Sequence, residues 1–362
     1  MTTAYGFVDL KDLYAQRVSE VGVQRIWDAV RESAGEYSRV ANGLLAEFAE
    51  MTTVAKEQIE LPGDGTLQPL DEHGNPLPVA PSGYYSVAYP IQGAGTAWGT
   101  NRVSRELLTV QEAERFTLDA MQRDGDWLIR HMLAGIFDNV AWTFNDKIGP
   151  NGAKGLGDIT IEPLANGDTV TYKRKGNVAA ATDDHYLATA SAIADATNPF
   201  PTINRELSEH PSNGNGRILV YAASDLIDAI SGLSSFVDVD DPDVMVGDDS
   251  DRVSNVPVAA PGDEVIGKVK GTRCWIVEWS GLPATYMIAK VEGIPLLKMR
   301  EYPAASLQGF FPEFANVDGN HTINRMLRYA GFGVSNRVAG LVYRIGNGTY
   351  AIPSGYGAPL SV

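Results

Sequence analysis

The closing part of the chain, residues 318–346, constrains the fold more than any other stretch. Its sequence, DGNHTINRMLRYAGFGVSNRVAGLVYRIG, alternates apolar residues with arginines and short polar residues, which is the period-two pattern of a β-strand. No acidic residue follows Asp318 within it. We expect the chain to turn at Gly331 and Gly333 and to continue as a second apolar strand. A sheet is therefore predicted at this end of the sequence.

A single long helix is predicted from residue 109 to about residue 140. Thr109 and Glu112 have the spacing of a capping box, in which each side chain bonds the backbone amide of the other residue. A helix of this length spans about 46 Å, which suits a spine across a flat body. Apolar residues recur three, four or seven positions apart, at Val110, Ala113, Thr117, Met121, Leu128, Met132, Ile136 and Val140.

Residues 61–107 form a long connection, rich in glycine and proline, with no helical periodicity. Within it, Tyr85, Val87 and Tyr89 alternate as on a strand, and Trp98 and Val103 are expected on the returning strand. A loop of this length is uncommon in a compact domain unless it has a task. An aromatic hairpin projecting from a body would be a poor surface for a monomer. We therefore expect another subunit to cover it.

The other segments mix helices and strands, so the predicted fold class is α+β. Residues 1–60 are expected to be helical, in two or three pieces, because Gly22, Gly35 and Gly43 interrupt the apolar stripe. Further helices are expected at 183–196 and 224–230, a hairpin at 159–172 around Asn166-Gly167, and strands at 218–221, 265–277 and 285–302, the last two in one sheet.

The chain is acidic, with a net charge of −16, and the charge is unevenly placed. Residues 265–362 carry 10 basic and 5 acidic residues, so the negative charge lies in the part before them. Such asymmetry either lets unlike ends of two copies attract or serves solubility alone. The acidity argues against a protein whose main task is to grip nucleic acid, since phosphate contacts need clustered Lys and Arg. The compact basic run is Lys173, Arg174 and Lys175, for which a solvated turn and a DNA contact are the alternatives.

Known catalytic and metal-binding motifs are missing from the sequence. None of the five histidines is paired at metal-ligand spacing, and neither a nucleophile elbow nor a Walker loop occurs. Seven aspartates at 238–251 invite a divalent cation, but the EF-hand pattern fails at Pro242 and Met245, and a solvated loop is the alternative. Cys274, the single cysteine, is expected to be buried, and the chain has neither a signal peptide nor a membrane-spanning run. The sequence therefore predicts no catalytic, cofactor-binding or metal-ligating residue.

The order of the predicted elements resembles the major capsid proteins of tailed bacteriophages, with the Hong Kong 97 phage fold. The resemblance places an N-terminal arm at 1–60, an extended loop at 61–107, a spine helix and peripheral domain at 108–222, an axial domain at 223–320 and returning strands at 321–362. Its closing signature is similar to Thr322-Ile323-Asn324-Arg325, then Arg328, Gly331 and Gly333, then Val338-Ala339.

The resemblance implies a structural subunit of the virion that does no chemistry and assembles in the host cytoplasm. Pentamers and hexamers would close an icosahedral shell around double-stranded DNA, which would be touched only weakly and non-specifically. A portal, a separate scaffolding protein and decoration proteins are the implied partners, with no membrane. No lysine occurs between Lys56 and Lys147, so the covalent crosslink of some members has no donor in the loop.

Two other functions stay open at this point. One is an encapsulin-type compartment, in which the same fold encloses enzymes, and the other is a soluble α+β enzyme of another family. For the shell, the residues expected to contact neighbouring subunits are aromatic residues of the loop and arginines of the loop and of the closing strand. They are Tyr84, Tyr85, Tyr89, Trp98, Arg102, Arg105, Arg325 and Arg328. For Arg325 and Arg328, contacts within the sheet and plain solvent exposure are the alternatives. Replacement of Trp98 by alanine is expected to leave a folded subunit that assembles poorly.

Overall fold

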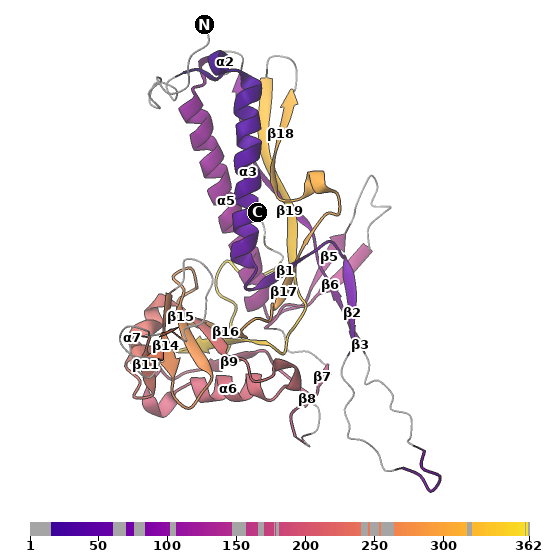
Figure 1. Ribbon diagram of the computed structural model, residues 1–362, viewed down its shortest axis with the longest axis vertical. Coiled ribbons are helices and arrows are strands. Elements are labelled where there is room, and N and C mark those ends of the chain that lie inside the picture. The colour runs from indigo at the N-terminus through magenta and orange to yellow at the C-terminus, as the bar shows by residue number, and fades with distance from the viewer. Residues whose placement is uncertain are drawn as a thin grey trace.

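The computed structural model is an elongated molecule in which a helix-and-sheet stalk rises from a second, broader sheet body (Figure 1). It describes residues 16–60, 70–75, 84–101, 106–146, 157–165, 170–176, 178, 181–239, 245–246, 253–254, 264–316, 321–358 and 360. Within these ranges, no helix is long and apolar enough to span a membrane.

The predicted long helix is present as α5, Val110–Phe137, and its capping box is confirmed. The amide of Glu112 donates to the Thr109 hydroxyl over 3.2 Å, and the amide of Thr109 donates to the Glu112 carboxylate over 3.0 Å. The helix ends earlier than expected, because Asp138 is extended and its carboxylate accepts from the amide of Val140. A second long helix, α3 (Val23–Leu45), lies beside α5 and follows the short α2 (Val18–Val21) (Figure 1).

The stalk's sheet is built around β19, a strand of 14 residues, His321–Val334. β4 (Gln92–Asn101), β18 (Phe310–Asn316) and β17 (Leu297–Glu301) all pair antiparallel with it, and β1 (Ala49–Thr52) adds to β17 in parallel. The helices α3 and α5 pack on this sheet through a small apolar core. Its buried members are Val30, Ala34, Ala120, Met121, Phe310 and Met326.

The expected turn at Gly331 and Gly333 is wrong, because both residues lie inside β19. A Cβ atom on Gly331 would lie 2.0 Å from the carbonyl oxygen of Pro90, and one on Gly333 would lie 2.7 Å from that of Ala88. The glycines therefore let the chain before β4 pass directly against the strand. Glycine in a sequence signals both a turn and a close backbone approach, and the second applies here.

The broader body is a seven-stranded mixed sheet in the order β11-β14-β15-β10-β16-β20-β9. Helices α6 (Phe200–Ser208) and α7 (Ile227–Ser231) bury one face, and the other face packs against the ends of α3 and α5. Every residue of β10 is buried, as expected for a strand covered on both faces. The strands are β9 (Tyr186–Thr189), β10 (Ile218–Ala222), β11 (Phe236–Asp238), β14 (Glu264–Val269), β15 (Cys274–Glu278), β16 (Tyr286–Val291) and β20 (Gly340–Ile345).

Several predictions for this body are corrected. The helix expected at 183–196 is the edge strand β9 followed by a 3₁₀ turn, Asp195–Thr197, because β9 pairs in parallel with β20. The boundary expected between residues 222 and 223 would divide one sheet, since β10 lies between β15 and β16. Residues 285–302 form two strands in different sheets, β16 and β17. Cys274 is buried as predicted, and burial raises the pKa of its thiol to about 12.

Four two-stranded hairpins complete the described fold. β2 (Lys56–Glu60) pairs with β3 (Tyr84–Ala88), so Tyr85 and Trp98 do not lie on two arms of one hairpin. β6 (Gly157–Ile161) pairs with β5 (Trp142–Asp146) rather than with residues 169–172. The others are β7 (Thr171–Tyr172) with β8 (Ala181–Thr182), and β12 (Met245–Val246) with β13 (Val253–Ser254). Short 3₁₀ turns lie at Pro211–Asn213, Ser224–Leu226 and Ala305–Leu307.

Candidate assembly surfaces

The β2–β3 hairpin leaves the side of the molecule at a base held by hydrogen bonds and ion pairs (Figure 1). The Tyr89 hydroxyl donates to Glu57 over 3.0 Å, and Lys298 of β17 donates to both oxygens of the same carboxylate, over 2.9 and 2.8 Å. Burial beside Glu57 raises the pKa of Tyr89, so its phenol stays protonated. These contacts fix where the hairpin starts.

Tyr84 and Tyr85 point to opposite faces of β3, as alternation on a strand requires. The Tyr84 side chain is 67 % exposed, which is unusual for a large aromatic residue. Tyr85 is half-buried, and its hydroxyl lies 3.4 Å from the carbonyl oxygen of Ser335. One face of the hairpin therefore exposes the ring of Tyr84, while the opposite face contacts its own subunit through Tyr85.

A second uncovered apolar surface follows the outer side of α5. Leu118 is 59 % exposed, and Ile129, about three turns further along the same side of the helix, is also exposed. A groove of about 240 Å³ runs between α3 and α5, lined by Ile26, Val30, Val110, Leu118 and Met121 among others. This surface and the hairpin with Tyr84 are thus two places where large apolar side chains face solvent.

Trp98 is packed within its own subunit. It lies on β4, paired with Asn324 of β19, and its ring stacks on Phe116 with centroids 5.7 Å apart. The ring of Trp27 is 6.4 Å away on the other side. Because Trp98 is half-buried in these contacts, replacement by alanine is expected to weaken the subunit's own packing, and the expectation of a defect in assembly alone is corrected.

Tyr89 and Arg328 are fully buried, so their assignment to contacts between subunits is wrong. Arg328 of β19 donates through Nε to both oxygens of Asp124 on α5, over 2.7 and 2.9 Å. Its Nη1 lies 3.4 Å from Oε1 of Glu301 on β17. Burial raises the pKa values of both carboxyls despite the guanidinium. Arg328 thus joins the helix to the sheet. Of the alternatives given for it, a contact within the subunit's own sheet agrees best with this position.

The other predicted arginines divide between the surface and undescribed segments. Arg325 is half exposed and forms a 3.4 Å ion pair with Glu313 on the neighbouring strand β18. Arg102 and Arg105 lie outside the described residues. Most of the acidic loop at 238–251 is also undescribed. Of the predicted contact residues that the structure describes, Tyr84 is therefore strongly exposed and Arg325 is half exposed.

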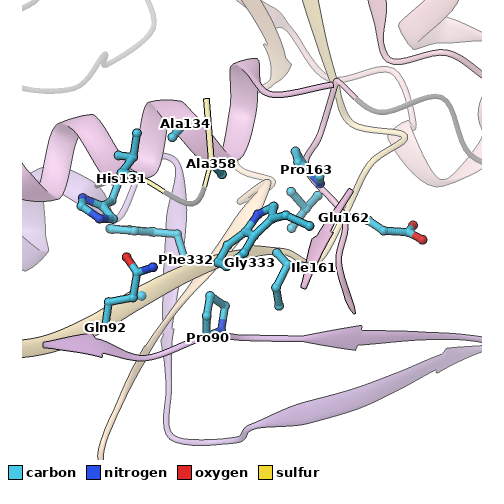
Figure 2. A pocket seen from close by; sticks show the side chains of 15 residues that line it. Pro90, Gln92, His131, Ala134, Ile161, Glu162, Pro163, Phe332, Gly333 and Ala358 are labelled. Carbon is cyan, nitrogen blue, oxygen red and sulfur yellow. The ribbon is translucent and has the colours of Figure 1, made fainter. Parts of the chain in front are cut away.

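One enclosed cavity lies where α5, β6, β19 and the C-terminal residues meet (Figure 2). Its volume is about 30 Å³, enough for a water or two and too small for a substrate. His131 lines it, and its Nδ1 donates to the carbonyl oxygen of Trp127 over 2.9 Å. Burial lowers the pKa of His131 to about 4, so the ring is neutral at pH 7. The cavity is a packing feature, and His131 has a structural role beside it.

Solved structures that match the chain include phage structures, capsids and an encapsulin. A structure from Mycobacterium phage Patience matches 99 % of this chain and 99 % of its own, with 18 % identity and a TM-score of 0.70. The mature capsid of bacteriophage PhiM1 matches 82 % and 84 % with 9 % identity and a TM-score of 0.46, and the native GTA particle capsid matches 85 % and 91 % with 11 % identity and a TM-score of 0.47. The last two likenesses are too distant to carry an argument.

The fold is therefore that of phage capsid proteins, and the agreement with the Patience structure extends over the whole of both chains. The expectation of a mixed helix-and-sheet, phage capsid-like fold is thereby confirmed. No protein-family model matches the sequence, and no curated protein does. The likeness, at 18 % identity, concerns the fold.

Proposed function

We propose that this protein is the structural subunit of a tailed-phage capsid, forming pentamers and hexamers of an icosahedral shell. The observation that carries the proposal is the full-length agreement in fold with the Patience phage structure. The two uncovered apolar surfaces support it, since a subunit that works alone would rarely leave them to solvent. In this assignment the seven-stranded sheet is the axial domain and the stalk is the peripheral domain with its spine helix α5.

The assembly mechanism would be mutual burial of these surfaces. The β2–β3 hairpin of one subunit, with Tyr84, would lie over the outer side of α5 of the next subunit, near Leu118. Each apolar Å² removed from water contributes about 25 cal/mol before the costs of association. Single contacts of this kind are modest, but symmetry repeats them around every capsomer, so the closed shell is stable.

The partners follow from the same proposal. The protein would be part of the virion. It would assemble in the host cytoplasm together with a scaffolding protein, a portal and decoration proteins. The net charge of −16 would keep the inner wall from adhering to packaged double-stranded DNA. In the basic run at 173–175, Arg174 pairs with Glu209 at 3.2 Å and Lys175 donates to the Gly214 carbonyl over 2.8 Å, which favours a structural turn over a DNA contact.

The encapsulin-type compartment is the remaining alternative with the same fold, and a cargo enzyme bound inside purified particles would favour it. The soluble enzyme is the less supported alternative, since capsid-like neighbours favour a non-enzymatic role. Sedimentation and negative-stain microscopy of the purified protein, expressed with and without a scaffolding partner, test the proposal. We expect closed particles with the partner. Monomers and dimers alone under both conditions would contradict a shell subunit.

A further inference from the structure

A cluster of ionisable side chains pins the β7–β8 hairpin to the end of α6. Asp183 follows β8, and Glu209 and His210 follow α6 directly. The Nε2 atom of His210 lies 2.8 Å from a carboxylate oxygen of Asp183 and 3.9 Å from one of Glu209. All three donor atoms lie within 4.8 Å of one another. The His210 side chain is 3 % exposed, so the cluster is built into the fold.

The two ring nitrogens of His210 face different partners, Nδ1 the backbone of Lys173 and Nε2 the Asp183 carboxylate. Nδ1 lies 3.4 Å from the backbone carbonyl oxygen of Lys173, which accepts only, so Nδ1 carries a proton. In the neutral ring, the Nε2 lone pair then faces the Asp183 carboxylate, and two acceptors at 2.8 Å need a cation between them. A backbone carbonyl on one ring nitrogen is the usual support of a histidine that binds metal through the other.

The charges around the ring also favour a cation. Asp183 and Glu209 contribute two carboxylates, against which Arg174 places one guanidinium, 3.2 Å from Glu209 Oε1. This Oε1 atom is buried, and burial raises the pKa of Glu209. His185 also faces Asp183, and the edges of the Tyr172 ring contact both histidines. When His210 is neutral, the two carboxylates and the one guanidinium leave one negative charge, which a cation would balance.

We propose that Asp183, Glu209 and His210 bind a divalent cation of the zinc class, which clamps the β7–β8 hairpin to the body. Zinc takes imidazole nitrogen and carboxylate oxygen at about 2.0–2.2 Å, which puts tetrahedral ligand atoms about 3.4 Å apart. The observed separations of 2.8 and 3.9 Å from Nε2 bracket that value. A fourth position would be left for water. This site lies beyond the capsid function proposed above and does not depend on assembly.

Calorimetric titration of the chelator-treated full-length subunit with Zn²⁺, at pH 7.5 and as free subunits, tests the site. We expect one ion per chain and a raised melting temperature, because the ion binds the folded state. His210→Gln and Asp183→Asn should each weaken binding by at least about tenfold. Glu206→Gln is the matched control, since Glu206 lies in the same helix and its pairing with Arg205 is exposed. It should bind zinc as the native chain does.

Arg174→Gln provides a test in the opposite direction. The variant removes a cation that opposes the metal at Glu209, so zinc should bind several-fold more tightly. Native-strength binding by His210→Gln, loss of binding by Arg174→Gln, or no zinc binding by the native chain would each overturn the proposal.

Discussion

At the scale of single residues, the buried ion cluster of Arg328, Asp124 and Glu301 connects the long helix α5 to the sheet. Arg328 is fully buried, and its guanidinium contacts both carboxylates and the ring of Phe310. A buried charge is tolerated only while its partners are present. Loss of Arg328, or of Asp124, which accepts two hydrogen bonds from it, should therefore destabilise the fold.

Asp124→Asn removes the carboxylate that holds Arg328 through two hydrogen bonds. We expect it to lower the free energy of unfolding by about 3–5 kcal/mol, because a buried guanidinium is left without its main partner. Chemical denaturation followed by circular dichroism measures the change. Asp119→Asn is the control, since Asp119 forms an exposed pair with Arg123 on the same helix. Equal stability of the two variants would contradict the role given to Arg328.

Glu301→Gln tests the excess negative charge of the cluster. Burial raises the pKa of Glu301, so the folded state holds its proton more tightly than the unfolded state does. The free energy of unfolding therefore falls as the pH rises through the folded-state pKa of Glu301, and it recovers when acid protonates the carboxylate. The amide oxygen of glutamine can still accept from Gly309, so the variant should match or exceed native stability at pH 7 and flatten its pH dependence between pH 4 and 7. A large loss of stability at pH 7 would mean that the charge itself is required.

At the scale of elements, β19 depends on two glycines that lie against the chain before β4. Gly331→Ala would place a Cβ atom 2.0 Å from the carbonyl oxygen of Pro90, so backbone must move. We expect a loss of at least about 1–3 kcal/mol in the free energy of unfolding. Gly35→Ala on α3, where a Cβ meets nothing within 4 Å, should instead gain about 0.5–1 kcal/mol. A tolerated Gly331→Ala would mean that the two segments are not in contact.

The β2–β3 hairpin can be removed at a defined point. Glu57 and Val87 are partners in its ladder, so an Asn-Gly turn in place of residues 58–86 closes it with the favoured two-residue connection. Because Glu57 and Tyr89 keep the base, the subunit should fold with a melting temperature close to that of the full chain. Particle formation, followed by sedimentation, should be lost. Normal shells from the shortened chain would show that the hairpin makes no essential contact.

The sequence was informative about elements whose signals are local. The capping box of Thr109 and Glu112 predicts the start of α5, and the apolar periodicity of 110–140 predicts its body but places its end about three residues too late, because a helix is stabilised by contacts along its own chain and its end is set by the Asp138 turn. The alternation in the closing segment predicts the two strands β19 and β20, but glycine signals a turn as well as a close approach, so the turn between them is expected at Gly331 and Gly333, before β19 ends. β9 was missed because its pairing with β20 lies more than 150 residues away in the sequence.

The sequence predicts that a projecting hairpin exposes aromatic residues, but it predicts less well which individual residues are exposed. An exposed aromatic such as Tyr84 follows from strand alternation in a projecting hairpin. Whether Tyr89 and Arg328 face a neighbour or their own core depends on which strands meet, and a strand pattern leaves both open. The pairs Lys298–Glu57 and His210–Asp183 join residues 241 and 27 positions apart, so no spacing rule could have found them.

At the scale of the whole molecule, the subunit is a fixed two-body frame with uncovered apolar surfaces at its margins. The ends of α3 and α5 share one core with the seven-stranded sheet. Fully buried Lys290 of β16 also bonds Glu47, in the turn after α3, which ties the bodies together. A rigid frame presents its hairpin and its helix surface in one relative orientation. Assembly then needs little ordering of the frame itself, which favours association.

A cryo-electron microscopy reconstruction of particles purified from co-expression with a scaffolding partner tests the central claim most directly. The account predicts a closed shell in which the β2–β3 hairpin of each subunit covers the outer side of α5 on a neighbour, with Tyr84 near Leu118. A shell in which each hairpin folds back onto its own subunit would contradict the mechanism. The absence of any closed particle would contradict the capsid function itself.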